Sequence, residues 1–316
     1  MGDTRDYRMT TIDSVLRRSL DARSGELILT LDPAFQGLPE VAHGGSVLAA
    51  FDALAGVTGP RHVGGVYRKR VPVGVPLTVS RGRGEATHTF ALRDATSVLV
   101  DGRVAPAADG ECGAPAPLLD HASNQPDAGH FTVAAPDGAQ KLRVSEGRRG
   151  VTLHPLPVSR TCFACGTENA LGLQVQLAFD DADVVGTWTP REPFRTADGT
   201  LTTGALTTLC DEAAFWLGAL ATGESGMTTD LAVTLHRAVP FGGPLTVTGA
   251  RTAARPQPDP RYRDTEVLVR TEDRTLVASA RITFVAVRGA ARRLVQGMLA
   301  MNDPAVVARV FPAYAR

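Results

Sequence analysis

The chain has 316 residues, 43% hydrophobic and 21% charged, which is typical of a globular protein long enough for two ordinary domains. Its 33 basic and 33 acidic residues cancel, so its charge offers no long-range attraction to nucleic acid or to an anionic membrane, and neither is expected as a partner. The amino-terminal segment lacks the apolar core of a secretory signal, and no stretch reaches the roughly 20 apolar residues of a membrane span. With four cysteines, too few for a disulfide scaffold, we expect a cytoplasmic protein.

The first half of the chain predicts one buried helix followed by antiparallel strands. A Gly-rich turn at His43-Gly44-Gly45 leads into a segment, 46–56, that is apolar nearly all round, and such a helix is buried rather than laid on a surface. Alternating apolar residues predict strands at 87–92 and 97–100. Residues 105–160 are rich in Pro, Ala, Gly and Asp, which is typical of a linker.

The second half repeats this order. A helix is expected at 205–220 and strands at 266–270 and 275–285, and the segment Val71-Pro-Val-Gly-Val-Pro-Leu-Thr-Val79 returns as Val239-Pro-Phe-Gly-Gly-Pro-Leu-Thr-Val247 with seven of nine positions identical. We therefore predict an α+β fold of two repeats, each a long central helix wrapped by an antiparallel sheet, docked as a pseudo-dimer within one chain. The expected units are an amino-terminal repeat 1–104, a linker 105–160, a carboxy-terminal repeat 161–287 and a helical extension 288–316 interrupted by Pro304.

Each predicted helix contains an acidic residue at the same distance from its entry. Asp52 follows the turn His43-Gly44-Gly45, and Asp211 follows Thr202-Thr203-Gly204 at the same spacing. Burying an unpaired carboxylate is costly, so each either faces a crevice, is satisfied by a cap, or belongs to a site. The free N–H groups at a helix entry stabilise negative charge, and glycine lets a substrate carbonyl approach them.

These motifs resemble those of the PaaI-like hotdog thioesterases. His43-Gly44-Gly45 followed by Asp52 is similar to the signature of that family, and Cys162-Phe-Ala-Cys-Gly-Thr-Glu-Asn-Ala-Leu-Gly-Leu173 resembles its Cys-x-x-Cys-Gly-x-x-Asn-Pro-x-Gly-Leu lead-in, with Ala170 where proline is usual. The resemblance covers roughly 25–104 and 161–287. It implies a double hotdog that hydrolyses acyl-CoA or acyl-carrier thioesters without metal, the coenzyme A or phosphopantetheine entering only as part of the substrate.

The resemblance also implies two composite sites at the interface of the repeats, each pairing the entry loop of one repeat with the acid of the other. The first would combine His43, Gly44 and Gly45 with Asp211 as base or nucleophile, and with the hydroxyl of Thr228 from the following strand. The second would combine Thr202, Thr203 and Gly204 with Asp52. This second site lacks the histidine and the first glycine, so we expect it to be degenerate.

Two further functions and several residue roles stay open. The same fold supports non-hydrolytic enoyl-thioester chemistry (hydration, dehydration or conjugate addition), or a catalytically inactive acyl-CoA-binding module. Arg68 and Arg70 either contact a phosphate of the substrate or form a solvated strand end. Cys162-x-x-Cys165 has no second pair at zinc-site spacing, which favours a tight structural turn without metal, and Glu212 is expected to be paired or solvated. A homodimer of the double hotdog is possible.

Overall fold

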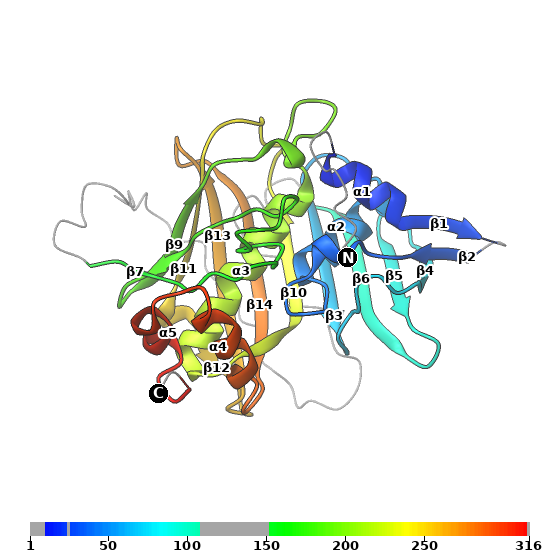
Figure 1. Cartoon of the computed structure of the whole chain (residues 1–316). Coiled ribbons are helices and arrows are strands. Elements are labelled where there is room, and N and C mark those ends of the chain that lie inside the picture. The colour runs from blue at the N-terminus through cyan, green and yellow to red at the C-terminus, as the bar shows by residue number, and fades with distance from the viewer. Residues whose placement is uncertain (1–9, 24–25, 108–151, 315–316) are drawn as a thin grey trace.

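The computed structural model describes residues 10–23, 26–107 and 152–314. Most of the expected linker, 108–151, lies outside these ranges. One antiparallel sheet of 14 strands runs through both halves in the order β1-β2-β4-β5-β6-β3-β10-β14-β13-β11-β9-β8-β7, with β12 paired to β13 (Figure 1). The amino-terminal half contains α1 (Ile12–Ser19), β1 (Leu20–Arg23), β2 (Glu26–Leu29), η1 (Pro33–Phe35), α2 (Gly44–Ala55), β3 (Arg61–Tyr67), β4 (Leu77–Arg83), β5 (His88–Arg93) and β6 (Val98–Pro106).

The carboxy-terminal half has the same plan and adds two short helices at its end. Its elements are β7 (His154–Pro155), β8 (Ala178–Phe179), β9 (Asp183–Trp188), η2 (Glu192–Phe194), α3 (Thr203–Thr222), β10 (Gly226–Leu235), β11 (Leu245–Ala250), η3 (Arg251–Ala253), β12 (Arg255–Pro256), β13 (Tyr262–Thr271), β14 (Leu276–Ala286), α4 (Ala291–Leu299) and α5 (Pro304–Val310). The α+β double hotdog expected from the sequence is therefore confirmed. β6 continues two residues past the expected repeat end, and β7 starts inside the expected linker.

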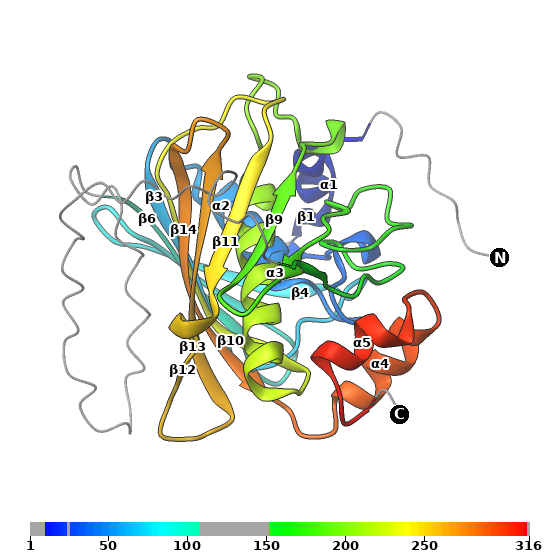
Figure 2. The same cartoon turned by 90° about the vertical axis from the view of Figure 1, so that its left-hand side faces the viewer.

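The two halves dock through their sheets and through their central helices. Strand β3 pairs antiparallel with β10, Val66 lying opposite Asp230, which makes the sheet continuous across the junction. Helices α2 and α3 pack side by side on one side of the sheet (Figure 2). They touch closely at Gly45, where a Cβ atom would stand 2.6 Å from the backbone of Thr208. The docking predicted from the repeat is what the chain adopts.

Both central helices begin two residues earlier than expected, because the second and third residues of each entry loop are already helical. Both end at a glycine in the left-handed conformation, Gly56 at φ 65° and Gly223 at φ 66°. Most of their apolar residues are buried, Phe51 and Trp216 almost completely, and form the core between the helices and the sheet. The helices thus hold their amino-terminal ends, and the entry loops, at the junction of the two halves.

Helix α1 was not predicted. Ile12 of α1 is fully buried and lies over the entry of α3, where a Cβ added to Gly204 would stand 3.4 Å from its methyl group. At the other end of the chain, α4 and α5 pack beside the lead-in to the second repeat, and the Asn302 side chain binds both backbone groups of Val158. Among the described residues, no helix is long and apolar enough to cross a membrane.

Candidate active site

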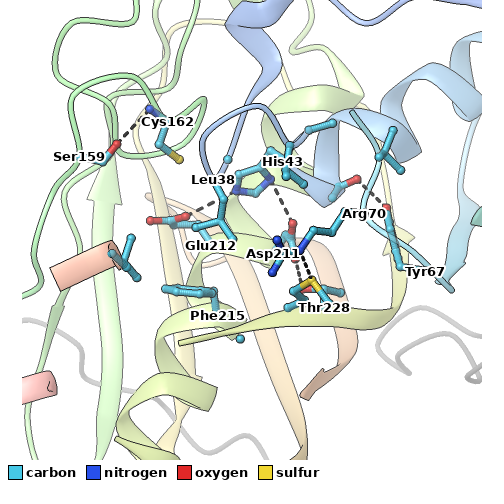
Figure 3. A pocket seen from close by; sticks show the side chains of 18 of the residues that line it. Leu38, His43, Tyr67, Arg70, Ser159, Cys162, Asp211, Glu212, Phe215 and Thr228 are labelled. Carbon is cyan, nitrogen blue, oxygen red and sulfur yellow. Dashed lines mark hydrogen bonds and ion pairs between the residues drawn. The ribbon is translucent and has the colours of Figure 1, made fainter. Parts of the chain in front are cut away.

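A pocket lies at the junction of the two repeats, and both repeats line it (Figure 3). His43, Gly44 and Tyr67 come from the first repeat, and Asp211 and Thr228 from the second. The structure therefore brings together the residues that the sequence assigned to the first composite site. Gly45 lies directly beneath, at the contact between α2 and α3.

Asp211 is buried on α3 and accepts hydrogen bonds from three donors. Thr228 Oγ1 donates to Oδ1 at 2.6 Å, and the Gly45 N–H donates to Oδ2 at 3.1 Å. His43 Nδ1 lies 3.0 Å from Oδ2. Burial alone would raise the pKa of Asp211, but the charge and hydrogen bond of His43, together with the hydrogen bonds from Thr228 and Gly45, lower the pKa from its usual value. The carboxylate is thus held ionised and in one orientation.

His43 links the two repeats through both ring nitrogens. Its Nδ1 faces Asp211, and its Nε2 lies 3.5 Å from Oε2 of Glu212 on the next residue of α3. Burial would lower the pKa of His43, but Asp211 and Glu212 outweigh that effect and raise the pKa well above its usual value. The imidazole therefore lies between two carboxylates in the wall of the pocket.

Gly44 lies so close to Asp211 that no side chain would fit at its position. A Cβ on Gly44 would stand 2.6 Å from Oδ2 of Asp211. Gly44 is the first residue of α2, so its N–H has no acceptor within the helix. The Tyr67 hydroxyl donates to the Gly44 carbonyl at 2.6 Å and fixes this peptide. Gly44 thus combines a close approach to Asp211 with the positive end of a helix dipole.

The second composite arrangement also forms across the interface, but its acid is fully engaged. Asp52 accepts hydrogen bonds from Nε of Arg61 at 2.6 Å and from Nη2 of Arg61 at 2.8 Å. Thr203, at the position of Gly44, donates its hydroxyl to Asp52 at 2.6 Å. Thr202 donates to Asp13 of α1 at 2.8 Å, and α1 covers Gly204. The Thr203 side chain and the Arg61 guanidinium therefore occupy, beside Asp52, the space that Gly44 leaves free beside Asp211.

The basic residues after β3 divide into two groups. Arg68 pairs with Asp101 at 2.5 Å and does not belong to the pocket lining found among the described residues. Lys69 and Arg70 line the pocket, and Arg70 Nε lies 3.3 Å from Sδ of Met227. Of the two arginines singled out in the sequence, the structure places Arg70 at the site and Arg68 away from it.

Sequence reasoning missed several lining residues. Glu212 was expected to be paired or solvated, and it is paired, since it lies 3.5 Å from Nε2 of His43 and accepts the Trp216 indole N–H at 2.9 Å. Its place in the pocket lining was not expected. Cys162 and Cys165 also line the pocket, as do Leu294 and Met298 of α4. A second acid inside an apolar helix was the available signal for Glu212. No local pattern indicates that α4 folds back to the site.

No protein-family model matches the chain, and no curated protein matches it in sequence. Solved structures do match. A candidate thioesterase II of Thermobifida fusca has a TM-score of 0.55 at 18% identity, covering 89% of this chain and 100% of that chain. A conserved protein of unknown function with a hotdog fold from Alicyclobacillus acidocaldarius has a TM-score of 0.53 at 13% identity, covering 87% and 97%. The dehydratase domain of the CurJ module of curacin polyketide synthase has 0.52 at 10% identity, covering 84% and 93%. At these identities the likenesses show the hotdog fold of the chain.

Proposed function

We propose that this protein is an enzyme of the PaaI-like thioesterase type that hydrolyses an acyl thioester at the pocket between its two repeats. The observation that carries the proposal is the pairing of Gly44 with Asp211, in which a glycine at a helix entry lies against a carboxylate from the other repeat. Acyl transfer needs a backbone donor for the developing oxyanion and a group that handles the proton of the attacking water. Gly44 and Asp211 supply these two groups within one pocket.

Asp211 keeps one acceptor site that can bind a water molecule. An ionised carboxylate offers about four lone-pair sites, and three donors, from Thr228, Gly45 and His43, occupy three of them. In the proposed reaction a water donates a proton to Asp211 as its oxygen bonds to the thioester carbon, and the carbonyl electrons move to the oxygen facing the Gly44 N–H. Collapse of this oxyanion breaks the carbon–sulfur bond, and the proton passes from Asp211 to the thiolate.

The residues that line the pocket indicate which chemical groups the substrate carries on either side of the thioester. Leu38, Phe215 and Met298 form an apolar surface that suits an acyl group, while Lys69 and Arg70 supply positive charge. We therefore propose acyl-CoA or an acyl-carrier protein as substrate, its phosphopantetheine arm passing the basic residues, with no separate cofactor. We also propose that the protein acts in the reducing cytoplasm, a setting compatible with Cys162, Cys165 and Cys210 forming no disulfide.

The second candidate is non-hydrolytic chemistry on an enoyl thioester. Two observations favour it: the fold-level likeness to a dehydratase domain, and a paired His43 and Asp211 able to carry protons. An inert acyl-CoA-binding module is the third candidate, in which the same pocket holds the thioester unchanged.

One experiment separates the three. The full chain is incubated with a panel of saturated and enoyl acyl-CoA thioesters, and the products are identified by mass spectrometry. Hydrolysis gives free acid and free coenzyme A. A thioester whose mass changes by one water indicates hydration or dehydration, and binding without any product on every substrate would reject both enzymatic proposals.

A further inference from the structure

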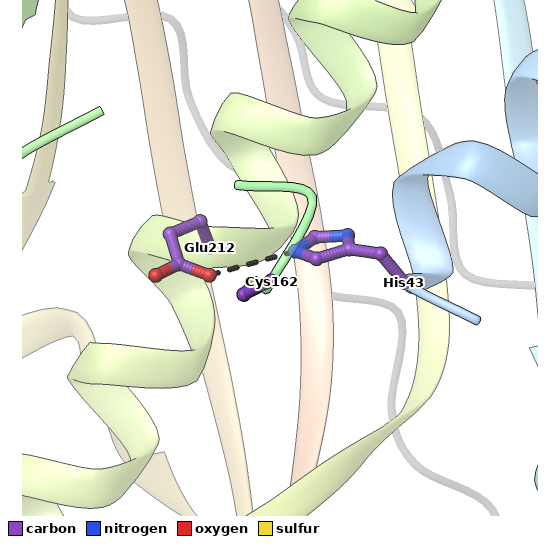
Figure 4. A group of neighbouring side chains, drawn as sticks. All are labelled: His43, Cys162 and Glu212. Carbon is purple, nitrogen blue, oxygen red and sulfur yellow. Dashed lines mark hydrogen bonds and ion pairs between the residues drawn. The ribbon is translucent and has the colours of Figure 1, made fainter. Parts of the chain in front are cut away.

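The inner wall of the pocket holds a second cluster of reactive side chains, of which the proposed hydrolysis uses only His43, as a donor to Asp211. The ligand atoms of His43, Cys162 and Glu212 all lie within 4.8 Å of one another, and all three side chains are buried (Figure 4). Cys165, three residues after Cys162 in the same turn, adds a second buried thiol that lines the same pocket. Two thiols, an imidazole and a carboxylate thus converge from three separate segments of the chain.

The backbone around the two cysteines is shaped to present sulfur. The Ala164 N–H donates to Sγ of Cys162 at 3.3 Å, and the Gly166 N–H donates to the Cys162 carbonyl at 2.9 Å. At Gly166 a Cβ would collide with the backbone of Cys162, so the turn requires glycine. An N–H aimed at a sulfur favours the thiolate over the thiol, and the thiolate is the form that binds metals. The turn therefore presents a pair of cysteines at the spacing common in zinc sites.

The turn is also fixed in place against the first repeat. The Phe163 N–H donates to the Gln36 carbonyl at 2.6 Å, and the Asn169 side chain donates to the Ala34 carbonyl at 2.7 Å. These bonds seat the lead-in of the second repeat on the loop that precedes His43 of the first. The cluster is consequently a fixed feature of the junction.

The separation of His43 and Glu212 suits two ligands of one metal better than a direct hydrogen bond. Their Nε2 and Oε2 atoms are 3.5 Å apart, longer than the usual range for a charged N–H···O pair. Nitrogen and oxygen ligands placed tetrahedrally at about 2.0–2.1 Å from zinc are about 3.3 Å apart.

Partners outside the cluster orient both ligands. Asp211 lies 3.0 Å from Nδ1 of His43, and the Trp216 indole N–H donates to Glu212 at 2.9 Å. A carboxylate on the far nitrogen of a histidine is the usual support for a zinc-bound imidazole.

We propose that His43, Cys162, Cys165 and Glu212 bind one Zn²⁺ ion in a closed four-ligand site that ties the lead-in, α3 and the entry of α2 together. Two thiolates with an imidazole and a carboxylate form a donor set that selects zinc over magnesium or calcium. The metal would take the place of the proton on Nε2 of His43, while the Nδ1–H of His43 remains hydrogen-bonded to Asp211. With four protein ligands the site has no open position, which makes it structural.

This site differs from the metal-free turn expected from the sequence because its remaining ligands are distant. The sequence offers no second cysteine pair near Cys162 and Cys165, but folding brings His43 of the first repeat and Glu212 of α3 to them. The inference does not depend on thioester hydrolysis, since no proposed step uses the metal.

Metal content in the absence of substrate tests the site. The full chain is purified without chelator under reducing conditions, its zinc is measured by elemental analysis, and the apoprotein is titrated with Co²⁺. We expect one zinc per chain, and with Co²⁺ the intense visible bands of a tetrahedral site together with a thiolate-to-cobalt charge-transfer band. Cys162→Ser and Cys165→Ser should each remove about half of that band and weaken zinc binding at least about tenfold, the lower end of what even supporting residues contribute.

Two further variants make the outcome decisive. Cys210→Ala removes a buried free thiol on α3 that does not belong to the cluster, and it should leave zinc content and the cobalt spectrum unchanged. Glu212→Gln keeps the shape of the side chain and should weaken zinc binding while leaving the thiolate band. A reduced, folded chain that takes up neither Zn²⁺ nor Co²⁺, or one whose zinc content is the same in Cys162→Ser as in the wild type, overturns the proposal.

Discussion

Gly45, at the start of α2 in the first repeat, donates its backbone N–H to Oδ2 of Asp211 on α3 in the second repeat, at 3.1 Å. This bond crosses the interface between the repeats, so the carboxylate is positioned by a backbone group of the other half of the chain. It also separates the tasks of the two glycines. Gly45 orients the acid, and Gly44 beside it leaves an N–H for the thioester carbonyl.

Asp211→Asn should lower kcat by a factor on the order of 10² or more, the usual effect of losing a positioned acid or base. The amide keeps the shape of the side chain and its bond from Thr228, but it cannot take a proton from water. Asp52→Asn should change kcat by only a few fold and lower the melting temperature, because Asp52 is engaged by Arg61 and Thr203. Both variants are compared on one acyl-CoA, with folding checked by thermal melting.

The reverse result would assign the reaction to the other composite arrangement. If Asp52→Asn abolishes turnover while Asp211→Asn retains it, the loop at Thr202, Thr203 and Gly204 is the working donor. That outcome requires Arg61 to leave Asp52 when substrate binds.

Gly44→Ala should reduce kcat by roughly 10²-fold, since a misplacement of about 1 Å can cost that much. The new methyl group would stand 2.6 Å from Oδ2 of Asp211, so either the carboxylate or the entry of α2 must move. Gly204→Ala is the matched control at the equivalent helix entry, where the nearest atoms would be 3.4 Å and 3.5 Å away. Activity within about twofold of the wild type is expected there. A fully active Gly44→Ala variant would remove this glycine from the mechanism.

The duplicated fold could be predicted because its signals are local and occur twice. Two apolar helices, each preceded by a similar loop and containing an acid at the same position, specify the repeat, and the resemblance to the hotdog thioesterases implies the pairing of His43 with Asp211. The asymmetry was also accessible, because Thr203 stands where Gly44 stands in the other copy. The second arrangement is blocked, however, by Arg61, which pairs with Asp52, and by α1, which contacts Thr202. No sequence pattern indicates either contact.

The residues missed at the site share a different cause. Glu212 is paired, as expected, but its place in the pocket was missed because helix periodicity points it away from Asp211, whereas the pocket includes both residues. Cys162 and Cys165 lie far along the chain from His43, and α4 reaches the pocket only by folding back over the second repeat. Contacts between segments this distant depend on tertiary packing, which no local pattern encodes.

Met298→Ala should shift the preferred acyl chain toward longer substrates. Met298 is buried on α4 and lines the pocket, so shortening it adds apolar space for the proposed acyl group. The ratio of kcat/KM for long over short acyl-CoA should rise by about tenfold, the lower end of the about 10–200-fold that one methylene can contribute in an apolar pocket. Val295→Ala, at a buried position of the same helix outside the described pocket lining, controls for loosening of α4. Equal ratios in the two variants would mean that α4 does not measure the chain.

Arg70→Ala should raise KM for acyl-CoA several fold and leave kcat nearly unchanged, because Arg70 lines the pocket, takes no part in the proposed proton transfer and would bind substrate and transition state alike. The matched variant is Arg68→Ala, whose guanidinium pairs with Asp101 instead. The effect is measured on an acyl-CoA and on the corresponding N-acetylcysteamine thioester, which lacks the phosphates. If Arg70 binds a phosphate, its loss weakens the first substrate and spares the second, and added salt reduces the difference. An equal rise in KM on both substrates would show instead that Arg70 shapes the pocket through its contact with Met227.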